Sequence, residues 1–326
     1  MNPAIEGWRG LAAILVMLAH FGPAAGLDHA FVKTAFTGVD LFFVLSGFVF
    51  GPILFGQEQQ WRAYALRRAF RIVPAYWLAV AVYALILLAQ TGSAGPWVQH
   101  LFFLHLSSPQ TAFALNPAFW SLVPEVEFYL LLPFLARWVR GSNQRFIALL
   151  FGALVLRLML GGLADRASAN IAFVVLHHLP GMLIEFLLGA AVWRFQGQAR
   201  KVWLFALGLW LWIALALAFG RFGDAGFDAV LGTGQVSLIA ALAASLMLAG
   251  SIHLPLHDGP VRAIALLSGS LSYGVYLFHN AALSLMPSVW AAVLATLIIA
   301  SGVHWALESP ARRLGRQLAA RVTSPT

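Results

Sequence analysis

Long apolar runs, separated by short polar connections, dominate this chain. Ten runs are long enough to cross a hydrocarbon layer about 30 Å thick, which needs roughly 17 to 25 helical residues. They lie near residues 8–25, 36–55, 71–90, 117–139, 146–163, 172–194, 202–219, 229–250, 263–283 and 288–307. Apolar positions are continuous within each run rather than alternating, which indicates helices and not the strands of a barrel. We therefore expect an all-α, polytopic integral membrane protein with about ten transmembrane helices.

Two shorter features refine this prediction. The first run follows Arg9, but Glu6 and His20 interrupt the pattern of a signal peptide, so an uncleaved helix is expected. The apolar piece Val98 to Leu106 is too short to span, and we expect it to lie at the interface or to re-enter on the outer side. Since no segment resembles a soluble domain, residues 1–326 are expected to form a single membrane-embedded domain.

The basic residues are distributed unevenly along the connections. With the N-terminus inside, sixteen of the 20 lysines and arginines fall in cytoplasmic segments, three in outer segments and Arg157 within a run. This positive-inside bias predicts that both termini are cytoplasmic. The net charge of +8 is therefore explained by membrane orientation, and no nucleic-acid partner is expected. Charged residues are 10% and hydrophobic residues 61% of the chain, which excludes an ordinary soluble domain. The absence of cysteine excludes disulfides, thiolate metal sites and an acyl-cysteine intermediate.

A histidine and two carboxylates occur at similar predicted depths. His20 lies eleven residues after Arg9, about 16 Å along the first helix. Asp40 and Glu125 fall in the outer turns of the second and fourth runs. Ionisable side chains inside a membrane need a partner, a water cavity or a function. A carboxylate that orients a histidine is the arrangement of a general base for a hydroxyl, although a purely structural buried pair has the same residue types.

Arg68 and Arg71, three residues apart, share one face of a helix between the second and third runs. Two guanidinium groups on one face can bind phosphates. Positive-inside placement also explains arginines at this position, so the spacing alone leaves both interpretations open.

Other intramembrane residues are assigned to packing. Arg157 and Glu185 lie near mid-membrane on adjacent antiparallel runs, which favours a buried ion pair over a substrate contact. Gly47 and Gly51 form a small-xxx-small pattern that lets a neighbouring helix approach closely.

The remaining histidines do not indicate a metal site. His253 and His257 are four apart, but Pro255 between them disrupts helical geometry. His279 and His304 are single histidines within runs, for which satisfied structural histidines are the default expectation.

Several segments together resemble acyltransferase family 3, the integral-membrane O-acyltransferases that modify bacterial surface polysaccharides and related glycans. The segments that match its motifs are Glu6 to Ala13 with His20, Gly38 to Phe48, Arg68 to Pro74, Trp120 to Leu122 with Glu125, Phe128 and Tyr129, Ser272 to His279, and Glu308 to Arg312. Departures are small: Glu6 replaces the usual aspartate, Trp8 the usual leucine, and Val126 a frequent second glutamate. The resemblance spans nearly the whole chain.

The resemblance implies acetyl-CoA or another acyl-CoA as co-substrate, with no permanently bound cofactor. The membrane is expected to be a bacterial inner membrane. The donor is expected to enter from its cytoplasmic side, with its phosphates at Arg68, Arg71 and Arg9. Some relatives carry a further extracytoplasmic domain after the last helix. This chain ends soon after Arg321, so we expect it to act alone or with a separate partner.

On the acceptor side, the resemblance implies a carbohydrate or glycan hydroxyl activated by His20, with Asp40 or Glu125 orienting the ring. Trp120 and Tyr129 are expected to stack on sugar. An acyl-histidine intermediate is equally compatible with these residues. The alternatives from other classes are a glycan transporter without transferase chemistry and an inactive scaffold. The sequence contains no repeated pair of broken helices, the usual indication of a transport site.

Overall fold

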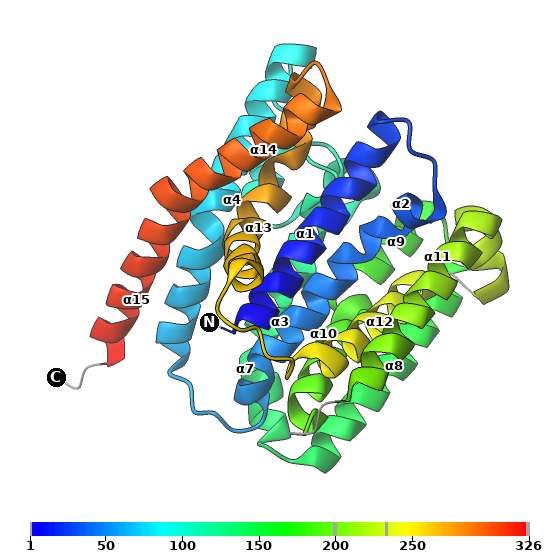
Figure 1. The fold of residues 1–326 in the computed structure, drawn as a ribbon, viewed down its shortest axis with the longest axis vertical. Coiled ribbons are helices and arrows are strands. Elements are labelled where there is room, and N and C mark those ends of the chain that lie inside the picture. The colour runs from blue at the N-terminus through cyan, green and yellow to red at the C-terminus, as the bar shows by residue number, and fades with distance from the viewer. Residues whose placement is uncertain (1, 198–200, 232–233, 324–326) are drawn as a thin grey trace.

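The structure is a computed structural model, and it describes residues 2–197, 201–231 and 234–323. All regular elements in these ranges are helical, which confirms the all-α prediction. The longer helices pack side by side as a bundle, with α15 lying along α4 at one side and α14 packed against α13 (Figure 1). The helices are α1 Pro3–Ala24, α2 Ala30–Thr34, α3 Gly38–Leu54, α4 Trp61–Thr91, α5 Trp97–Leu101, α6 Pro109–Ala112, α7 Leu122–Val139, α8 Asn143–Ala164, α9 Ala169–His177, α10 Leu179–Phe195, α11 Val202–Leu231, α12 Gln235–Ser251, α13 Pro260–Leu285, α14 Val289–Val303 and α15 Ser309–Thr323, with short turns η1 Ala35–Thr37, η2 His105–Ser107, η3 Phe119–Ser121 and η4 His304–Glu308.

Each of the ten predicted runs coincides with helical structure over its described residues, while positions 232 and 233 of the run at 229–250 lie outside them. Within the described ranges, nine stretches are long and apolar enough to cross a membrane, and α12 is a shorter apolar helix of 17 residues. The chain is therefore a polytopic membrane protein. Which end of the bundle faces the cytoplasm stays a prediction from the arginine distribution.

Two of the differences from the predicted boundaries bear on charged residues. Helix α4 begins at Trp61, ten residues before the predicted start, so Arg68 and Arg71 lie within a continuous helix. The run at 172–194 is broken at His178, whose backbone is extended, with φ −75° and ψ 164°. Pro180 lies in the first turn of α10, where its missing N–H needs no helical partner, whereas in a continuous helix its ring would collide with the carbonyl four residues earlier, which explains a new helix start here.

Glycines allow the central helices to pack closely. A methyl group on Gly47 of α3 would collide with the Phe186 carbonyl of α10, and one on Gly189 of α10 would collide with the Val44 carbonyl of α3. Gly51 lies against the side chain of Trp193. The predicted packing role of Gly47 and Gly51 is confirmed.

The segment of α5 and η2, which is too short to span, packs against α4 and η3. The rings of His100 and His105 are stacked with centroids 4.1 Å apart. The Tyr76 hydroxyl donates to the His100 carbonyl at 2.9 Å, and His105 Nε2 donates to the Phe119 carbonyl at 3.1 Å. Burial lowers the pKa of His105 to about 3, so this ring is neutral and structural at ordinary pH.

Candidate active site

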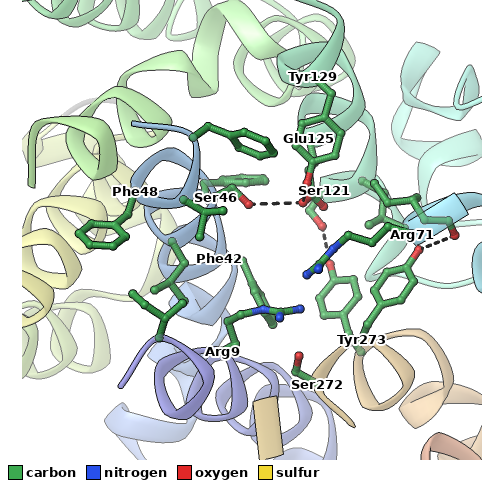
Figure 2. Close-up of a pocket in the computed structure, with 18 of the residues that line it drawn as sticks. Arg9, Phe42, Ser46, Phe48, Arg71, Ser121, Glu125, Tyr129, Ser272 and Tyr273 are labelled. Atoms are coloured by element: carbon green, nitrogen blue, oxygen red, sulfur yellow. Dashed lines mark hydrogen bonds between the residues drawn. The ribbon is translucent and has the colours of Figure 1, made fainter. Parts of the chain in front are cut away.

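A cavity of about 400 Å³ opens between α1, α3, α4, α7 and α13. Aromatic rings and a set of polar side chains surround it (Figure 2). The polar and charged residues that line the cavity are Asn2, Glu6, Arg9, Ser46, Arg68, Arg71, Ser121, Glu125, Tyr129, Ser272, Tyr273 and Tyr276. The structure thus brings four of the predicted charged site residues, Arg9, Arg68, Arg71 and Glu125, into one hollow.

Three arginines from two helices give the cavity its positive charge. Arg9 of α1 forms an ion pair with Glu6, with Nη1 3.2 Å from Oε2. The guanidinium of Arg68 lies 5.0 Å from the ring centroid of Phe50 and has a buried Nε without a hydrogen-bond partner. Arg71 makes neither hydrogen bond nor ion pair to any residue in the described ranges, and Figure 2 shows it reaching toward the same space as Arg9. This guanidinium is therefore available to an anion.

Glu125 lines the same cavity and is held by two hydroxyls. Tyr129 donates to Glu125 Oε1, and Ser46 donates to the same oxygen at 3.3 Å. The lining then contains three arginines against the carboxylates of Glu6 and Glu125, an excess of one positive charge. An uncompensated cation in a membrane-embedded hollow favours an anionic ligand such as a phosphate.

His20 does not line this cavity. Its Nδ1 lies 2.9 Å from the Val16 carbonyl and 3.2 Å from Nε2 of His279 on α13. Tyr276, which does line the cavity, has its ring centroid 6.3 Å from that of His279, and its hydroxyl bonds to Ser121 and to the Ala118 carbonyl. The histidine pair therefore adjoins the cavity through Tyr276 but does not line it.

The predicted pairing of His20 with a carboxylate is not seen. Asp40 is buried and faces the opposite way, against Glu185 of α10 and Ser237 of α12, while Glu125 bonds to Ser46 and Tyr129. The reason is rotational: α1 presents His20 to α13, whereas α3 presents Asp40 to α10 and α12. Equal depth along two helices does not fix which faces meet.

The predicted ion pair between Arg157 and Glu185 is also wrong. Arg157 is fully buried, and its guanidinium donates to the carbonyls of Leu176 at 3.1 Å, Gly181 at 2.9 Å and Gly234. The structure gives no ion pair between Arg157 and Glu185. The break between α9 and α10 leaves carbonyls such as that of Leu176 without a helical partner, and the arginine satisfies them.

The two predicted sugar-stacking residues are not brought together. Tyr129 lines the cavity beside Arg68, whose guanidinium lies 5.9 Å from its ring centroid. Trp120 is outside the lining and packs edge-on against His177, with centroids 4.7 Å apart. Sequence reasoning also missed the contact of His279 with His20. The sequence feature that indicated a role for His279 was the spacing of Tyr273, Tyr276 and His279. They occur at intervals of three, which places them on adjacent turns of one helix face.

Residues 2–306 match the family described as Acyltransferase domain. The chain belongs to this family. The resemblance to integral-membrane acyltransferases is thereby confirmed across nearly its whole length.

Known relatives are bacterial proteins. The chain is 28% identical over 374 residues to Peptidoglycan O-acetyltransferase OatA of Listeria monocytogenes, a match that covers 96% of this chain and 56% of that protein. It is 31% identical over 330 residues to Exopolysaccharide production protein ExoZ of Rhizobium meliloti, covering 94% and 98%. It is 30% identical over 217 residues to Putative membrane-bound transacylase BcsY of Komagataeibacter xylinus, covering 58% and 50%. The chain thus spans about half the length of OatA and nearly all of ExoZ. No solved structure matches it.

Proposed function

We propose that this protein transfers an acyl group, acetyl in the first instance, from acyl-CoA to a hydroxyl of a carbohydrate in or at a bacterial inner membrane. Family membership and relatives named for peptidoglycan acetylation and exopolysaccharide production support this reaction. The observation that carries the proposal is the cavity, in which three arginines from α1 and α4 surround a hollow of about 400 Å³.

In this proposal the donor enters at the arginine-rich end of the bundle, which faces the cytoplasm. Arg71 and Arg68 bind phosphates of acyl-CoA, and Arg9, held by Glu6, extends the positive surface. The pantetheine arm then follows the aromatic lining of the cavity toward Ser121 and Tyr276. This direction carries the thioester from the charged entrance toward the histidine pair.

His20 supplies the base. The Val16 carbonyl can only accept, so the Nδ1 that faces it carries the hydrogen, and Nε2 of the neutral ring has the free lone pair. The acceptor hydroxyl gives its proton to Nε2 while its oxygen bonds to the thioester carbon. The C–S bond then breaks, and the CoA sulfur leaves and takes the proton from the imidazolium.

This chemistry needs the thioester to reach beyond the cavity lining, since Tyr276 belongs to the lining and the histidine pair next to it does not. A two-step route uses the same residues: His20 Nε2 attacks the thioester carbon and CoA leaves as the thiolate. The acceptor hydroxyl then attacks the acyl group, the bond from the acyl carbon to Nε2 breaks, and the hydroxyl proton passes by way of Nε2 to the thiolate. Both routes predict loss of transfer when His20 is removed.

The test uses the full chain purified in detergent, with acetyl-CoA, surface polysaccharide from the host and CoA release as the readout. His20→Ala should lower kcat by about 100-fold or more, because positioned proton transfer is lost. Arg68→Ala should mainly raise KM for acetyl-CoA, because a phosphate contact is removed. Arg137→Ala is the matched control, since this arginine is exposed at the end of α7 and outside the cavity.

Wild-type rates in a folded His20→Ala protein would overturn the role of this residue. A glycan transporter gives a different result altogether, because it moves the polysaccharide across a vesicle membrane without releasing CoA.

A further inference from the structure

We infer that His279 is the residue that positions the base, by holding the ring of His20 in one orientation and one tautomer. This inference rests on the proposed function and deepens it. It assigns to a neutral histidine the role that sequence reasoning gave to Asp40 or Glu125.

The hydrogen on His279 is fixed by its own helix. His279 is completely buried, and its Nδ1 lies 3.1 Å from the Val275 carbonyl and 2.9 Å from the Tyr276 carbonyl. Carbonyl oxygens only accept hydrogen bonds, so Nδ1 is the donor. In the neutral ring Nε2 is then an acceptor, and this atom lies 3.2 Å from Nδ1 of His20.

Both partners of His20 Nδ1 are therefore acceptors. The Val16 carbonyl belongs to the same helix as His20. A hydrogen bond to this carbonyl alone would still let the imidazole ring of His20 rotate. His279 adds a second acceptor from another helix, with the two ring centroids 4.9 Å apart. Together they keep the hydrogen on Nδ1 and aim Nε2 away from α13. Nε2 has no hydrogen-bond partner within the described ranges, so it is free for a substrate proton.

A neutral partner suits this location. A carboxylate next to His20 would have to be desolvated in the membrane before any reaction occurs, whereas a neutral imidazole avoids this penalty. When His20 becomes an imidazolium during transfer, the lone pair of His279 Nε2 forms a charge-assisted hydrogen bond to it. The interaction thus strengthens as positive charge develops on His20.

Small residues hold the two helices at the required separation. Gly7 of α1 lies against Ala265 of α13, and Gly10 lies against Ser268 with no room for a methyl group. The matched spacing of these two pairs shows that α1 and α13 run parallel. The histidine pair continues the same contact further along both helices.

The experiment compares two substitutions of His279 in the full chain, with CoA release from acetyl-CoA in the presence of host polysaccharide. His279→Gln keeps an acceptor oxygen near the position of Nε2, whereas His279→Leu keeps only the bulk. We expect His279→Leu to lower kcat by about 10- to 100-fold, as loss of a hydrogen bond to a charged group implies, with KM for acetyl-CoA unchanged. His279→Gln should recover most of that loss. In a His20→Ala background, His279→Leu should lower the residual rate no further.

If His279 only fills space, the activities of the two variants should be reversed, because leucine fills a buried apolar space better than glutamine. The inference is overturned if folded His279→Leu matches the wild type, or if His279→Leu is more active than His279→Gln. Both results leave the proposed function intact provided that His20→Ala is inactive. A wild-type chain that releases no CoA, or an active His20→Ala, refutes the proposed function itself.

Discussion

Arg157 is among the largest side chains that the bundle encloses completely, and it has three backbone carbonyls as partners. These carbonyls come from α9, from α10 and from the N-cap residue of α12, so one guanidinium ties together three segments. An enclosed cation of this kind contributes to stability through satisfied hydrogen bonds rather than through an ion pair.

Replacing Arg157 should therefore destabilise the protein. We expect Arg157→Leu to lower the free energy of unfolding by about 3 kcal/mol or more, because buried carbonyls lose their donor. Thermal unfolding in detergent measures this effect. Arg137→Leu serves as the control, since Arg137 is exposed, and an equal loss of stability in both variants would contradict the explanation.

For single residues, the sequence identifies which side chains are unusual for a membrane helix but not which partners they contact. Arg68 and Arg71 share a helix face by spacing alone, and the cavity contains both. The contact between His20 and His279 joins residues far apart in the sequence and depends on how α1 and α13 are rotated. Rotation about a helix axis follows from packing against all neighbours, which a list of apolar runs does not contain.

Elements were more predictable than contacts, because hydrophobic length marks a membrane helix strongly. All ten predicted runs appear as helical stretches. The exception was the break at His178, which apolar composition hides because both sides of it are equally hydrophobic. Glu127 stabilises this break: its carboxylate accepts from His178 Nδ1 at 2.6 Å and from the Leu179 backbone N–H at 2.7 Å. Leu179 and Pro180 were the available signal, since a proline marks a new helix start.

The contact between α3 and α10 gives a prediction for the helix pair. Gly47→Ala should weaken packing strongly, because the added methyl group meets the Phe186 carbonyl and the two helices must move apart. Gly152→Ala in α8 is the matched control, because its methyl group meets only open space, and it should be neutral or stabilise by up to about 1 kcal/mol. Comparison of unfolding temperatures tests this pair, and equal temperatures would show that the contact tolerates separation.

For the whole molecule, the predicted orientation can be tested because the chain has no cysteine of its own. Single cysteines at Gln57, between α3 and α4, and at Ser93, between α4 and α5, lie on opposite sides of one spanning helix. A membrane-impermeant thiol reagent should label Ser93→Cys in intact spheroplasts and Gln57→Cys only after the membrane is opened. The reverse pattern would place the arginine-rich cavity on the outer side, which would contradict the proposed entry of acyl-CoA from the cytoplasm.

The position of Tyr276 has a consequence for the energy balance of the host cell. A hollow lined with charged groups would short-circuit the proton gradient if it ran through the whole bundle. Here Tyr276, anchored to Ser121 and the Ala118 carbonyl, belongs to the lining of the hollow, and neither residue of the histidine pair does. In the proposed function, acyl-CoA can thus enter from one compartment although the charged lining does not extend to the histidine pair.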